Sequence, residues 1–135
     1  MGRILAIDYG EKRSGIAVTD ELQLIASGLT AVDTSDLIEF LTEYINTEQV
    51  ERFVIGLPKR LGNEPSAIEP KIQDLIKELN LKFDIPVERV DERFTSKLAA
   101  RALYQSGLSK KKRQDKYLLD EVSATIILQS YLESH

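Results

Sequence analysis

The chain has 135 residues, of which 42% are hydrophobic and 30% are charged, and its formal net charge is -4. This length supports one hydrophobic core and is too short for two ordinary domains, so we expect a single domain over residues 1–135. The negative charge disfavours a protein that coats nucleic acid non-specifically, but it is compatible with a local basic groove. No apolar run approaches the roughly 20 residues of a membrane span. The N-terminus shows no signal-peptide pattern, so we expect a cytoplasmic protein without a membrane partner.

Cysteine and histidine chemistry is almost absent from this chain. It contains no cysteine, and its one histidine is the last residue, His135. Disulfides, thiolate nucleophiles and cysteine-bound zinc are therefore excluded. Any catalysis must rest on carboxylates, hydroxyls, lysine or arginine.

The first 18 residues predict a hairpin with an acid at one end. Residues 4–7 form an apolar run typical of a strand buried on both faces, and residues 16–18 form a second run. Asp8 ends the first strand, and Lys12 and Arg13 lie in the turn. A carboxylate at the end of a buried strand requires a partner, a hydrogen bond or a cation. The alternative is that Asp8 is an ordinary turn residue and that the two cations are solvated.

The rest of the chain predicts three further strands alternating with helices. Further strands are expected over residues 22–29, 52–57 and 85–91, and helices over 37–46, from a Ser66–Glu69 capping box to about 79, over 95–106 and over 116–132. Because the connection between the third and fourth strands runs through a helix, the fourth strand should pair in parallel with the first.

Two further acids occupy special places. The fifth strand ends at Asp91 and Glu92, and alternation along a strand does not decide which of them faces a site. Asp120 lies one turn before Ala124 and extends the apolar face of the last helix. A charge on that face requires a partner, although the positive end of the helix dipole alone could explain Asp120.

These acids converge if the first strand is central in the sheet. Asp8, Glu92 or Asp91, and Asp120 would then repel one another unless they bind a cation or hold protons. Oxygen ligands without histidine or cysteine favour Mg²⁺ or Mn²⁺. Such ions activate water for phosphodiester hydrolysis without any other catalytic side chain.

A dense basic run, KKKR at residues 110–113, directly precedes the last helix. The run is either a nucleic-acid contact or a solvated loop.

Four segments, DYGEKRSGIAV, VIGLP, VDERFTS and DEVSATIILQSYL, follow one another over nearly the whole chain. They resemble the YqgF family of small ribonuclease-H-like proteins, described as Holliday-junction resolvases and as nucleases that mature the end of small-subunit ribosomal RNA. The resemblance implies an α/β fold with a five-stranded mixed sheet, in the order 3-2-1-4-5, and helices on both faces.

The resemblance also implies particular site residues. Catalytic and metal-binding roles fall on three acids: Asp8, Glu92 and Asp120. Phosphate contacts fall on Lys12, Arg13 and Arg93, and the basic run adds four candidate substrate contacts: Lys110, Lys111, Lys112 and Arg113. Glu92 is preferred to Asp91 on the resemblance.

The leading hypothesis is a metal-dependent endonuclease that acts on structured or precursor RNA, at the 5′ end of pre-16S ribosomal RNA. The first alternative is cleavage of four-way DNA, which would require two sites in a symmetric dimer, so both a monomer and a homodimer are considered. A second is a non-catalytic nucleic-acid-binding module. The first hairpin is also similar to the phosphate loop of actin-like ATPases, but those require a second domain for which this chain is too short.

Overall fold

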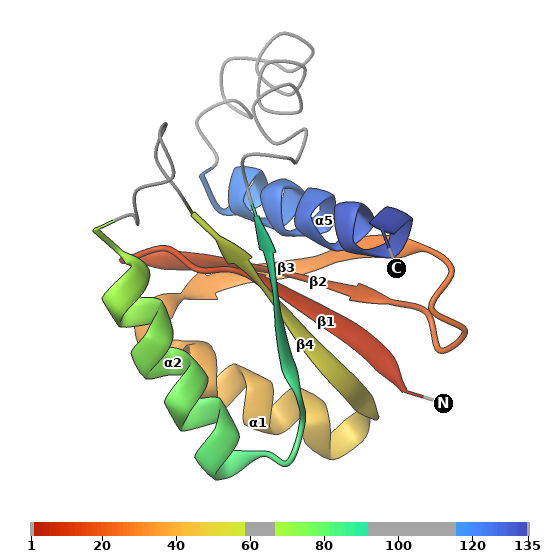
Figure 1. Cartoon of the computed structure of the whole chain (residues 1–135), viewed down its shortest axis with the longest axis horizontal. Helices are drawn as coiled ribbons and strands as arrows, with labels where there is room; N and C mark the ends of the chain where they lie inside the picture. The colour runs from red at the N-terminus through yellow and green to blue at the C-terminus, as the bar shows by residue number, and fades with distance from the viewer. Residues whose placement is uncertain (1, 59–66, 92–115, 135) are drawn as a thin grey trace, which may run out of the picture.

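The computed structural model describes residues 2–58, 67–91 and 116–134 (Figure 1). Its strands are β1 Arg3–Asp8, β2 Arg13–Thr19, β3 Ala26–Asp33, β4 Val50–Leu57 and β5 Val87–Asp91. Its helices are the short 3-10 helix η1 Thr34–Asp36, α1 Leu37–Thr47, α2 Glu69–Lys82 and α5 Lys116–Ser134. None of these described helices combines the length and the apolar character needed to cross a membrane.

The five strands form one mixed sheet in the order β3-β2-β1-β4-β5. β1 pairs antiparallel with β2 through a tight connection and parallel with β4, which it reaches through β3 and α1. β4 and β5 are also parallel and are connected through α2. The predicted strand order and the central place of the first strand are therefore confirmed.

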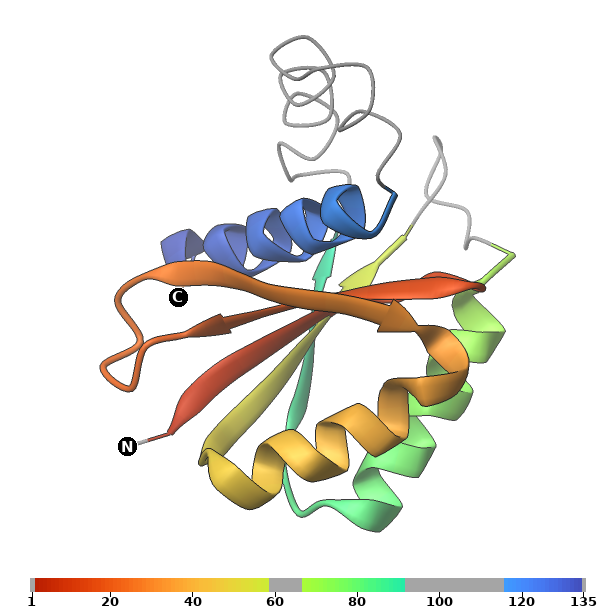
Figure 2. The same cartoon turned by 180° about the vertical axis from the view of Figure 1, so that it is seen from behind.

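Helices cover both faces of the sheet, as Figures 1 and 2 show: α1 and α2 lie on one face and α5 on the other. Alternation along β1 separates the two cores, because Leu5 and Ile7 pack toward α1 and α2 whereas Ile4 and Ala6 pack toward α5. By the same alternation, position 8 belongs to the face covered by α5.

Two expectations differ from the structure in detail, and a third is not tested by it. The third strand begins at Ala26, because residues 20–25 form a loop between β2 and β3 that is closed by backbone hydrogen bonds. The helix α2 begins at Glu69 with Ile68 as its N-cap, later than the predicted capping box implies, and Ser66 of that box lies outside the described residues. Glu69 instead accepts two hydrogen bonds from Arg89 of β5, at 2.8 and 2.9 Å. The helix expected over residues 95–106 lies outside the described residues.

Candidate active site

Asp8 and Asp120 lie at the same end of the sheet, on either side of a glycine. Asp8 is the last residue of β1, and it pairs across the hairpin with Gly15 of β2. A Cβ atom on Gly15 would lie 1.9 Å from the backbone oxygen of Asp120, so α5 lies directly on the strand there. Directly opposed residues of antiparallel strands carry their side chains about 5 Å apart. The strand end that carries Asp8 and the first turns of α5 are thus adjacent on the same face.

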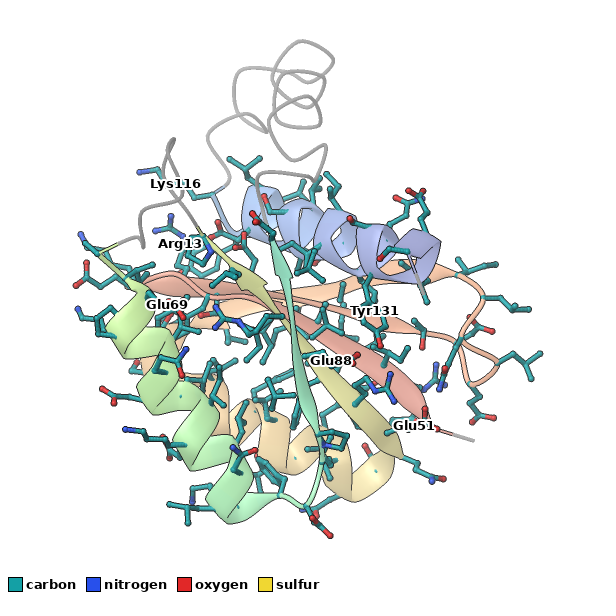
Figure 3. All side chains as sticks on the ribbon, viewed as in Figure 1. Arg13, Glu51, Glu69, Glu88, Lys116 and Tyr131 are labelled. Atoms are coloured by element: carbon teal, nitrogen blue, oxygen red, sulfur yellow. The ribbon has the colours of Figure 1, made fainter. Side chains whose placement is uncertain are left out.

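The carboxylate of Asp120 has a partner, as its position on the sheet-facing side predicts. Arg13, the first residue of β2, donates from Nε to Oδ2 of Asp120 at 2.9 Å. The side chains of Arg13 and Asp120 are only 26% and 17% exposed, so this pair is partly shielded from water. Figure 3 shows Arg13 beside the first turn of α5. Arg13 therefore neutralises one of the predicted metal ligands.

Tyr117 is a second interaction partner of Arg13. The Arg13 guanidinium lies 5.7 Å from the ring centroid of Tyr117, close enough for a cation–π interaction. The Tyr117 hydroxyl donates to Oδ1 of Asp33 at 2.6 Å. This hydrogen bond is the main reason why the pKa of Tyr117 is raised, so the phenol keeps its proton and remains a donor. Sequence reasoning missed Tyr117 and Asp33, which lie at the ends of distant elements.

A closed ring of hydrogen bonds shapes the turn between β1 and β2. The Gly10 amide donates to Ser14 Oγ at 3.4 Å, Ser14 and Thr34 hydroxyls are 2.8 Å apart, and the Thr34 hydroxyl donates to the Gly10 carbonyl at 2.6 Å. The Thr34 amide also donates to the carbonyl of Lys12 at 2.9 Å. The turn that follows Asp8 is therefore held in place by groups far apart in the sequence.

Gly10 is required by this turn, because a Cβ atom at that position would lie 2.2 Å from the Arg13 carbonyl oxygen. The sequence pattern identified Gly10 correctly. Ser14 and Thr34 were missed, although a buried serine at the start of an apolar strand is a signal that could have pointed to the ring.

The two faces of β5 are identified by their contacts. Glu88 accepts from Tyr131 of α5, whereas Arg89 contacts Glu69 of α2. Alternation then places Asp91 on the α2 face, opposite to the face that carries Asp8. These contacts decide which face of the sheet Asp91 lies on, a question that the sequence left open. Glu92 lies outside the described residues.

Among the predicted substrate contacts not yet described, only Lys12 lies within the described residues. Lys12 is exposed in the turn beside Asp8. Arg93 and the four residues of the basic run, Lys110, Lys111, Lys112 and Arg113, lie outside the described residues. Within the described residues, no group of three or more acids or histidines is placed to hold a metal ion. The structure thus brings together Asp8, Asp120, Lys12 and Arg13 of the predicted set.

Comparison with known proteins gives a consistent result over the whole length. The family described as RuvX: Holliday junction resolvase matches residues 2–134. A protein of Christiangramia forsetii is 59% identical over 133 residues, which cover 98% of both chains. One of Bacteroides fragilis is 58% identical over 135 residues, covering 99% of this chain and 98% of the relative. Both relatives carry the name "Putative pre-16S rRNA nuclease".

Solved structures agree on the fold. The fowlpox virus resolvase in complex with its substrate Holliday junction DNA matches with a TM-score of 0.58 and 17% identity, covering 98% of this chain and 97% of that chain. A second structure of the fowlpox virus Holliday junction resolvase matches with a TM-score of 0.51 and 21% identity, covering 98% of this chain and 99% of that chain. With the family model and the relatives, the family resemblance of the four sequence motifs is confirmed, and the chain belongs to the RuvX family.

Proposed function

We propose that this chain is a divalent-metal-dependent endonuclease that cuts precursor RNA at the 5′ end of the 16S ribosomal RNA. Asp8, Glu92 and Asp120 are its catalytic and metal-binding residues. The observation that carries the proposal is the contact between Gly15 and the Asp120 backbone, which places two carboxylates at one end of the sheet.

The donor set of the two described acids fits Mg²⁺ or Mn²⁺. Both ions prefer oxygen ligands, and Asp8 and Asp120 contribute carboxylates only. Gly56 of β4 follows Val54 on the α5 face and carries no side chain between Asp8 and β5. Glu92 follows β5 in the sequence and lies outside the described residues, and we assign it as the third ligand.

Each residue of the site then has a defined task. A bound divalent ion would lower the pKa of water and stabilise the negative charge on the leaving oxygen. Asp8 holds its carboxylate on the rigid end of a central strand, and Asp120 holds its own on the first turns of α5. Arg13 neutralises Asp120 in the absence of a cation. When a cation occupies Asp120, the Arg13 guanidinium is available for a substrate phosphate.

Substrate contacts extend around this end of the molecule. Lys12 projects from the turn after Asp8, where it can pair with phosphate. We assign Arg93 and the basic run to the same role, since they directly follow β5 and directly precede α5 in the chain. RNA is preferred as substrate because the relatives at 59% and 58% identity are named as pre-16S rRNA nucleases.

Cleavage of four-way DNA junctions is the second candidate. It is favoured by the family description and by the DNA complex of the structural neighbour. Resolution of a junction requires two symmetric cuts, so this activity would require a homodimer with its two sites facing one junction.

The test compares both substrates under one set of conditions. Labelled pre-16S RNA and a labelled four-way junction are incubated with the protein and with Mg²⁺, Mn²⁺ or chelator. We expect metal-dependent cleavage of the RNA and its loss in Asp8→Asn. Asp84→Asn is the matched control, since Asp84 is an exposed acid in the loop before β5. Full activity of Asp8→Asn, or full activity in chelator, would contradict the proposal.

The ends of the product decide the chemistry. Water activated by a carboxylate-held cation leaves a 5′-phosphate and a 3′-hydroxyl, because the 2′-hydroxyl does not take part. Mapping a 2′,3′-cyclic phosphate instead would show attack by the 2′-hydroxyl and would remove the metal role from the three acids.

A further inference from the structure

The loop between β2 and β3 exposes three large apolar side chains at the end of the sheet opposite to Asp8. Leu22, Leu24 and Ile25 are 62%, 70% and 66% exposed. We call these three residues the apolar loop. Figures 1 and 2 show it projecting beyond the sheet, beside the C-terminal end of α5. Single exposed leucines are ordinary on protein surfaces, but three large apolar side chains exposed on one short loop are typical of an interaction site.

Hydrogen bonds hold this loop in its exposed conformation. One carboxylate oxygen of Asp20 accepts from the amides of Leu24 and Ile25, both at 2.8 Å. The hydrogen bonds from these backbone amides, above all the one from Ile25, lower the pKa of Asp20. The Asp20 carboxylate therefore stays charged and remains a hydrogen-bond acceptor. The Asp20 carbonyl also accepts from the Gln23 amide at 3.0 Å. The backbone is thus prevented from folding the three side chains inward.

Gln23 links the loop by hydrogen bonds to Gly2 and to Glu51 of β4. Its backbone has a φ of 61°, in the left-handed region that a non-glycine residue adopts at a cost. Its side-chain amide donates to the Gly2 carbonyl and to Glu51, each at 2.8 Å. Strain and bonding of this kind are expected where a loop must hold one shape, as at a binding surface.

A shallow hollow continues the apolar loop onto α5. It has about 340 Å³ of space and is lined by Leu24, Ile25, Ala26, Gln129, Leu132 and Glu133. The surroundings are acidic: Glu21, Glu51 and Glu133 are exposed. Arg3, a cation on this side, already donates to Glu48 and to the Thr19 carbonyl. An acidic rim repels RNA phosphates and a second copy of itself, and it attracts a basic protein surface.

We infer that the apolar loop and its hollow bind a basic protein segment that inserts an apolar side chain between Leu24 and Leu132. This inference rests on the proposed function for its partner class: proteins that coat ribosomal RNA are basic because they neutralise phosphates. The loop lies at the far end of the sheet from Asp8, so protein and RNA can be bound together. Docking on the protein component of the precursor particle would bring the nuclease to its RNA.

The test uses two forms of one substrate: the precursor small-subunit particle with its proteins, and the same RNA stripped of protein. In L22S/L24S/I25S, affinity for the particle should fall at least tenfold, whereas affinity for the naked RNA should stay within twofold. Leu81→Ser is the matched control, because Leu81 is an isolated α2 leucine that is 88% exposed. Equal binding of the particle by the wild type and the triple variant would overturn the inference, as would failure of the wild type to bind the particle.

Charge reversal separates the possible partners. E21K/E133K should weaken particle binding if the partner is a basic protein, and should strengthen it if the partner is RNA. A concentration-dependent dimer of the wild type that the triple variant loses would assign the loop to a second copy and overturn the inference. The proposed nuclease function is tested separately by Asp8→Asn, which should abolish cleavage without changing particle binding. Unchanged melting temperatures confirm that the loop variants fold.

Discussion

Arg13 illustrates how one residue can serve two states of the site. It forms an ion pair with Asp120 at 2.9 Å and lies over the ring of Tyr117, which is itself bonded to Asp33. Removing one member of a partly buried pair leaves the other charge without compensation. The Asp120 carboxylate on the sheet-facing side of α5 is therefore compensated by Arg13 within the protein itself.

Arg13→Gln should strengthen Mn²⁺ binding a few-fold in the absence of nucleic acid, because the guanidinium no longer competes for the Asp120 carboxylate. The same change should weaken RNA binding, since a phosphate contact is lost. Calorimetric titration with Mn²⁺ measures the first effect and RNA titration the second. Arg13→Lys, which keeps a cation, should remain closer to the wild type. Weaker Mn²⁺ binding by Arg13→Gln would instead mean that Arg13 only orients Asp120.

At the scale of elements, the position of α5 depends on small residues in the sheet. Gly15 allows the α5 backbone to contact β2 directly at Asp120, and Gly28 of β3 makes room for the side chain of Glu121. Farther along the helix, Ile127, Leu128 and Tyr131 are buried against the sheet. The first turns of α5, which carry the candidate ligand, are thus set by backbone contact and the later turns by apolar packing.

Gly15→Ala should destabilise the fold by about 2 to 3 kcal/mol, because its Cβ would lie 1.9 Å from the Asp120 oxygen and the helix must shift. Mn²⁺ affinity should fall with it, since that shift moves the ligand. Gly28→Ala is the control: its Cβ meets only the flexible Glu121 side chain, so the cost should stay below about 1 kcal/mol. Urea denaturation gives both values. Equal costs for the two variants would refute the direct contact of α5 with β2.

At the scale of the whole molecule, the two ends of the sheet differ in their charged side chains. The end that carries Asp8 combines the cations Lys12, Arg13 and Lys116 with the acids Glu11 and Asp33, whereas exposed glutamates surround the apolar loop at the other end. A protein with a net charge of -4 can bind RNA only through a local basic region. Under the proposed function, the cations at the Asp8 end would contact the RNA phosphates, with the acids of the site toward the substrate.

The basic run should contact substrate and contribute little to folding. Changing Lys110, Lys111, Lys112 and Arg113 to Ser should leave the free energy of unfolding within about 1 kcal/mol of the wild type. RNA affinity should fall, and its dependence on salt should become less steep, because fewer counterions are released. Filter binding from low to high salt measures both. Lys77→Ser with Lys82→Ser on α2 is the control, and an unchanged salt slope in the run variant would show that the run is solvated.

Much of the architecture followed from local patterns. Apolar runs, turn residues and helical spacing predicted the hairpin, the helical crossover and the parallel pairing of the fourth strand with the first, and they placed Asp8 at the end of the first strand. The full strand order came from the family resemblance. Glu69, expected in a local capping box, instead pairs with Arg89 on another element. The third strand begins later in the chain than predicted, because the Asp20 carboxylate accepts hydrogen bonds from the Leu24 and Ile25 amides of the preceding loop. In both cases a specific bond outweighed a local preference.

Periodicity along the chain predicted the strands and helices and which of their faces are apolar, since side chains on one face recur at a fixed spacing in the sequence. Tertiary structure alone decided which charges meet. Arg13 and Asp120 are 107 residues apart, and their pairing requires the close approach of α5 to Gly15. It also decided that Asp91 faces α2, because only the contacts of Glu88 and Arg89 identify the two faces of β5. Long-range contacts depend on packing between elements, which no local pattern specifies.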